Sequence, residues 1–74
     1  MNPQYSIIIE WSDENDTFVV FLPEWIDRYA MPCGDGKTYD EALQSAKDAL
    51  ETFIQFANDD GIVLPSPRVY AHVT

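Results

Sequence analysis

Carboxylates are the side chains of this sequence with the greatest potential for chemistry. The candidates for a metal site are Glu10, Asp13, Glu14, Asp16, Asp35 and Asp40. Enzymes with two catalytic metals hold divalent cations about 4 Å apart between such groups. Here only Glu10 falls in a β-like segment, and the next three acids crowd into a short polar turn, so no second strand offers an inward-facing acid. We therefore expect a solvated acidic loop and no metal site, with a divalent-metal nuclease as the less favoured alternative.

Other reactive residues lack the neighbours that catalysis requires. His72 has no Cys or acid at ligand spacing, and we expect it on the surface of a terminal strand. Cys33 lies between Pro32 and Gly34 with no identifiable base to activate it, so we expect a small loop residue. We predict no catalytic residue and no cofactor, and we expect that the protein is not an enzyme.

Composition and charge favour a binding protein. The 74 residues allow one domain spanning 1–74, and 46% hydrophobic residues suffice for a core. Acidic residues outnumber Lys and Arg by 13 to 4, giving a formal charge of −9. This charge repels nucleic acid and favours a basic protein partner, or it serves solubility alone. The single Cys and the lack of a leader or a long apolar run indicate a soluble cytoplasmic protein that contacts no membrane.

The first half of the chain has the pattern of a β-hairpin. We predict a central strand over 4–11, a polar loop over 12–16 and a second strand over 17–22 that Pro23 ends. A short third strand is expected near 28–31. The large apolar residues that follow Pro23 either cover the core or form a binding surface; they are Trp25, Ile26, Tyr29 and Met31.

The second half begins with a helix. Thr38 and Glu41 form a capping box, and Gly61 supplies a left-handed C-terminal residue. Apolar residues recur at three- and four-residue steps at Ala42, Leu43, Ala46, Ala49, Leu50, Phe53, Ile54 and Ala57. A last strand over 68–73 completes the order ββ(β)αβ. This predicts an α+β fold with a small, mainly antiparallel sheet of three to four strands and one helix packed on it.

Several segments together resemble the HicB-like antitoxin family of bacterial toxin-antitoxin pairs. They are YSIIIEWSDENDTFVVFLPEW, GKTYDEALQSAKDALETFIQFANDDG and LPSPRVY, in this order. The most specific parts are Leu22-Pro23-Glu24, the run from Gly36 to Ala42, and Gly61 followed by Leu64-Pro65-Ser66-Pro67-Arg68. The stretch from Trp25 to Cys33 departs from the family pattern. Many relatives also carry a C-terminal DNA-binding domain, for which this chain has no room, so we expect no direct nucleic acid binding.

The resemblance implies a partial RNase H-like fold and a partner. That partner is a HicA-type toxin, a small basic RNase with a catalytic histidine, which the antitoxin binds and sterically blocks. The candidate toxin-binding residues are Glu10, Asp13, Glu14, Asp16, Glu24 and Trp25. An orphan HicB-like module that binds another protein is the alternative. Because a small sheet leaves open edges, we also expect a homodimer through an edge strand or the helix.

Overall fold

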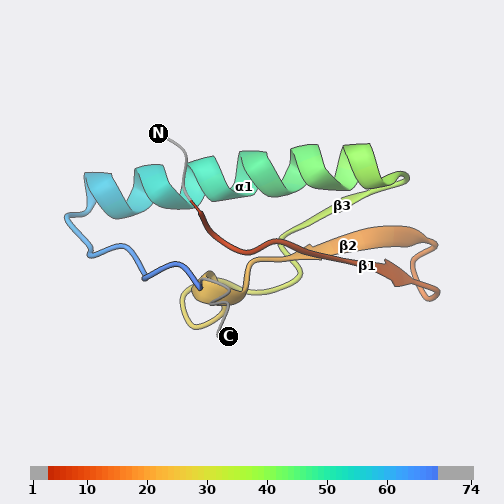
Figure 1. Cartoon of the computed structure of the whole chain (residues 1–74), viewed down its shortest axis with the longest axis horizontal. Helices are drawn as coiled ribbons and strands as arrows, with labels where there is room; N and C mark the ends of the chain where they lie inside the picture. Colours follow the sequence, from red (N-terminus) through yellow and green to blue (C-terminus); the bar gives the residue numbers. More distant parts are fainter. Residues whose placement is uncertain (1–3, 69–74) are drawn as a thin grey trace, which may run out of the picture.

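A three-stranded antiparallel sheet carries one long helix on one face in the computed structural model, which describes residues 4–68 (Figure 1). The elements in chain order are β1 (Ile8–Ser12), β2 (Thr17–Phe21), the 3-10 helix η1 (Pro23–Trp25), β3 (Gly34–Gly36) and α1 (Tyr39–Asp59). The predicted α+β class, with one helix packed on a small antiparallel sheet, is confirmed. The last strand predicted over 68–73 lies outside the described residues except for Arg68, which is not in a strand.

The strand order differs from the sequence prediction. The sheet runs β1-β2-β3, so β2 is central and β1 is an edge strand that starts only at Ile8. A strand does form within the predicted segment, but the prediction that it is central and begins at residue 4 is wrong. The hairpin itself is confirmed, since Ile8 pairs with Phe21 and Ser12 with Thr17.

The third strand also forms elsewhere than expected. Arg28 and Tyr29 both donate their backbone N–H to the Trp25 carbonyl at 3.0 Å, so this segment turns and does not extend. The strand predicted near 28–31 is wrong, and β3 forms at Gly34–Gly36 instead. Glycine is required there because α1 crosses at close range: a Cβ on Gly36 would lie 2.7 Å from the Glu41 carbonyl carbon.

Local signals set both ends of α1. The Thr38 hydroxyl accepts the Glu41 backbone N–H at 3.1 Å, which confirms the N-cap. The Glu41 carboxylate accepts from the Thr38 hydroxyl at 3.4 Å and not from the Thr38 backbone, so only half of the capping box forms. At the other end Gly61 has φ 68°, and Ile62 N–H reaches the Ala57 carbonyl at 2.8 Å. This is the Schellman geometry that a C-terminal glycine allows.

The core lies between α1 and the sheet in two adjoining clusters. The first joins Val20 to two small helix residues, Ala42 and Ala46, and the second joins Leu22, Trp25 and Leu50. Small side chains let the start of α1 approach β2 and β3 closely, whereas β1 is barely touched by the helix. Within residues 4–68, no further layer covers the opposite face of the sheet (Figure 1).

Candidate protein-binding surface

An exposed acidic turn joins β1 to β2. Glu10 on β1 and Asp13, Glu14 and Asp16 in the turn are all exposed, as the sequence predicts for a solvated loop. The turn is nevertheless ordered by its own hydrogen bonds. Asp13 accepts the Trp11 indole N–H at 2.8 Å, and the Lys37 ammonium donates to the Asp16 carbonyl at 2.9 Å. We define Glu10, Asp13, Glu14 and Asp16 as the acidic turn.

An aromatic strip with two exposed side chains begins at Trp11, whose indole N–H bonds to Asp13 of the acidic turn. Trp11 is 48% exposed and Tyr39 is 66% exposed. Phe18 lies between them, with ring centroids 5.0 Å from Trp11 and 4.4 Å from Tyr39. The chain thus exposes a continuous aromatic strip next to its carboxylates. An aromatic residue in a strand is expected to pack in the sheet; Trp11 does contact Phe18 but stays half-exposed. Tyr39 lies outside the apolar stripe that begins at Ala42, and no sequence pattern marked it as a contact residue.

Glu24 lies apart from the acidic turn and holds two chain segments together. Its carboxylate accepts the Ser6 backbone N–H at 3.2 and 3.1 Å, through its two oxygens, and the Arg68 backbone N–H at 2.7 Å. Burial by itself would raise the pKa of this carboxyl, but the backbone hydrogen bonds from Arg68 and Ser6 outweigh it and lower the pKa. Glu24 is therefore a structural clasp in this fold, with its acceptor oxygens already engaged.

The prediction that Trp25 belongs to an exposed binding face is wrong. Its side chain is 0% exposed, and it packs against Tyr5 at 5.4 Å and Phe53 at 5.7 Å between ring centroids. Tyr29 stacks on Phe53 at 4.0 Å, so the alternative that this segment covers the core is the correct one. Only Ile26 in the group is largely exposed, at 59%. The indole N–H of Trp25 has no hydrogen-bond partner among the described residues.

The reactive residues considered from the sequence are not assembled into a site. Burial raises the pKa of the Cys33 thiol, which favours the unreactive protonated form, and its Sγ lies 3.7 Å from the Val20 carbonyl oxygen. His72 lies outside the described residues. Among residues 4–68, no group of three or more His, Cys, Asp or Glu could hold a metal ion.

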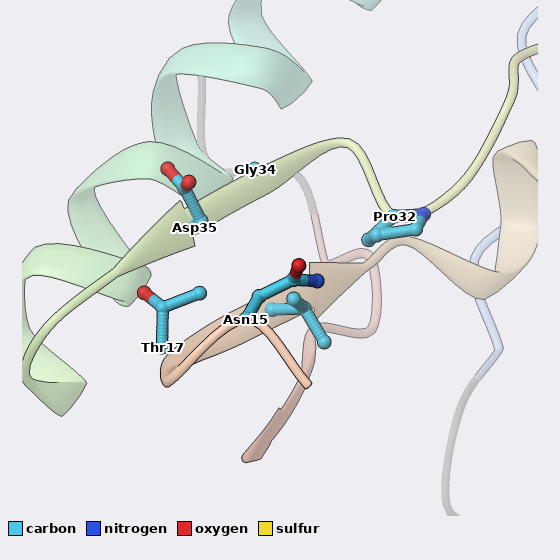
Figure 2. A pocket seen from close by; sticks show the side chains of 6 residues that line it. Asn15, Thr17, Pro32, Gly34 and Asp35 are labelled. Atoms are coloured by element: carbon cyan, nitrogen blue, oxygen red, sulfur yellow. The ribbon is translucent and has the colours of Figure 1, made fainter. Parts of the chain in front are cut away.

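An open hollow of about 340 Å³ lies beside β2 and β3 (Figure 2). Its lining residues are Asn15, Thr17, Val19, Pro32, Gly34 and Asp35. The Thr17 hydroxyl is engaged, since it donates to the Gly36 carbonyl at 2.9 Å, and Asp35 is the only ionisable lining residue. The hollow thus offers contact surface and lacks the paired groups that acid-base chemistry needs.

No helix within residues 4–68 is long and apolar enough to cross a membrane. No family model matches the chain, and no curated protein or solved structure is significantly similar to it. The resemblance to HicB-like antitoxins therefore stays a prediction.

Proposed function

We propose that this chain is a protein-binding module of the HicB-like antitoxin type, which docks on a basic HicA-type RNase toxin and covers its active site. The observation that carries the proposal is the exposed Asp13 carboxylate bonded to Trp11, which begins the aromatic strip that continues through Phe18 to exposed Tyr39. Carboxylates steer a basic partner and raise the association rate. Half-exposed aromatics supply the apolar contact that slows dissociation.

The geometry also supports steric inhibition over catalysis. A hairpin end that projects acids and aromatics can fill a basic, RNA-binding cleft, because its carboxylates take the places of phosphates. Neither Glu24 nor Trp25 contributes to this surface, since one is a clasp and the other is buried. The contact residues in this proposal are thus Trp11, Asp13, Glu14, Asp16 and Tyr39. Glu10 lies on the opposite face of β1 from Trp11 and adds only to the negative charge of the hairpin.

The test is an RNA-cleavage assay with the small basic RNase encoded beside this gene, into which the protein is titrated. We expect cleavage to stop at one equivalent of bound protein. Asp13→Lys with Glu14→Lys should slow association at low salt by about tenfold or more. Asp48→Lys with Glu51→Lys is the matched control, because it changes the net charge equally at exposed positions of α1 that belong to neither proposed contact surface.

Contact by the aromatic strip is tested separately. Trp11→Ala should weaken binding by about 30-fold, the equivalent of about 2 kcal/mol for a hot-spot residue. Cleavage that continues at full rate with excess protein, or the absence of such a neighbouring gene, would contradict the toxin and leave an orphan binding module.

The homodimer expected from the sequence remains a proposal. The described surface on which it would form is the last turn of α1 with the residues after it, where Phe56, Ile62 and Val63 are 51%, 50% and 82% exposed. Sedimentation of a monomer at micromolar concentration would contradict it.

A further inference from the structure

The outer edge of β1 is the least protected part of the sheet. The other edge strand, β3, has only three residues and lies under α1. β1 has five residues, carries a single charge at Glu10 and contains no proline. Soluble proteins usually shorten, charge or cover such an edge, because unpaired N–H and C=O groups can bind another strand. Among residues 4–68, no strand pairs with this side of β1.

Strand register identifies the backbone groups that face outward. The Val20 carbonyl accepts the Cys33 N–H at 2.9 Å, so the backbone of Val20 faces β3. Because these directions alternate along an antiparallel strand, Val19 faces β1 and exchanges hydrogen bonds with its partner Glu10. The N–H and C=O groups of Ile9 and Trp11, one residue to either side of Glu10, therefore point away from the sheet.

The side chains beside this edge differ between the two faces of β1. On the helix side are Ile9, which packs on the core, and Trp11, which is 48% exposed. On the opposite face are exposed Glu10 and Ile8, which is 40% exposed. An added antiparallel strand would thus place alternate side chains against apolar Trp11 and against the Glu10 carboxylate.

We propose that a partner protein adds an extended segment of alternating apolar and basic residues, antiparallel, to the outer edge of β1. This rests on the proposed function and specifies how the partner is held. Charge selects the occupant: a basic segment complements Glu10 and the formal charge of −9. A second copy would instead bring two strongly acidic chains together and place two Glu10 carboxylates on one face of the joined sheet.

The experiment measures backbone amide hydrogen exchange, residue by residue, by NMR on the full chain. The probe is a capped six-residue peptide of alternating valine and arginine. When the peptide is at ten times its dissociation constant, exchange at Ile9 and Trp11 should slow about tenfold. The Glu10 amide, which is already bonded to β2, should not change. If binding saturates without this pattern, or if no saturable change appears at millimolar peptide, the proposal is overturned.

Methylated peptides provide matched controls with identical charge and side chains. Residues directly opposite Ile9 and Trp11 share their face, so the valine amides are the ones that bond to β1. N-methylation of the valines should abolish the protection, and N-methylation of the arginines should preserve it. Equal binding of both methylated peptides would mean that the peptide is held by charge and not by backbone hydrogen bonds to β1, and it would overturn the proposal.

The free chain tests the other occupants. If the Ile9 and Trp11 amides are protected from exchange without peptide, the edge of β1 is already occupied and the proposal is overturned. Protection that rises with protein concentration would identify the occupant as a second copy of the chain. Protection that does not depend on concentration would identify it as another segment of the same chain. The peptide assay contains no RNase, so failure of toxin inhibition leaves its result unchanged. Conversely, inhibition without edge protection would uphold the proposed function and overturn the edge as its binding mode.

Discussion

Replacing Trp25 with Phe sets two opposing effects against each other. Trp25 is 0% exposed, and its indole N–H has no partner among the described residues. Phenylalanine is smaller by about 40 Å³, which costs about 1 kcal/mol as a cavity if the site does not relax. The loss of roughly 40 Å² of buried apolar surface costs about 1 kcal/mol more. Removing an unsatisfied buried donor returns about 1–3 kcal/mol.

We therefore expect Trp25→Phe to change the free energy of unfolding by no more than about 1 kcal/mol. Urea denaturation followed by circular dichroism measures this change without relying on Trp25 fluorescence. Each kcal/mol should also shift the melting temperature by about 4–8 °C in a domain of this size.

A matched variant isolates the hydrogen-bond effect. Benzothienylalanine keeps both fused rings and replaces the indole N–H with sulfur, so it should stabilise the fold by about 1–3 kcal/mol. A loss of about 2 kcal/mol or more in Trp25→Phe, with no gain from the isostere, would equal the packing effects alone. That result would refute the view that the Trp25 N–H is unsatisfied, because removing the N–H would then bring no gain. The indole N–H would have to form a hydrogen bond in the folded protein.

Three further substitutions test the clasp, the helix cap and the close approach of α1. Glu24→Gln should reduce stability by about 1 kcal/mol at neutral pH. Hydrogen bonds lower the pKa of Glu24 in the folded protein, so its contribution to stability is present above the unfolded pKa and is lost as pH falls through the folded pKa. The free energies of unfolding of the wild type and of Glu24→Gln should therefore converge in acid. A difference between them that stays constant with pH would contradict this structural role of the Glu24 carboxylate. Thr38→Ala should cost about 1 kcal/mol in urea denaturation through loss of the N-cap bond, and an unchanged midpoint would count against it. Gly36→Ala should be severely destabilising, because its Cβ would meet the helix backbone. The Cβ of Gly34→Ala would instead meet the Ser45 hydroxyl, so Ser45→Ala should partly restore the stability of that variant. Equal melting temperatures for Gly36→Ala and Gly34→Ala would refute the close approach of the α1 backbone to Gly36.

Short-range chemistry let the sequence determine the hairpin and the helix. The polar run between two β-branched segments gave the β1–β2 turn, and Thr38 and Gly61 gave the limits of α1 within one or two residues. These features depend on interactions between residues a few positions apart, so they are visible in a linear pattern. The exposure of the acidic turn follows in the same way, because a run of turn-forming acids cannot be buried without partners.

Only the tertiary structure decided which strand is central and which acid is structural. A Gly-Asp-Gly segment has little β propensity, and it becomes β3 because the glycines let α1 pass close to it while β2 supplies its hydrogen bonds. Glu24 differs from the acids of the turn through contacts with Ser6, 18 positions away, and Arg68, 44 positions away. Trp25 is buried because Tyr5, Leu50 and Phe53 meet around it. Such contacts arise only when distant segments pack together, so residue type and local spacing do not encode them.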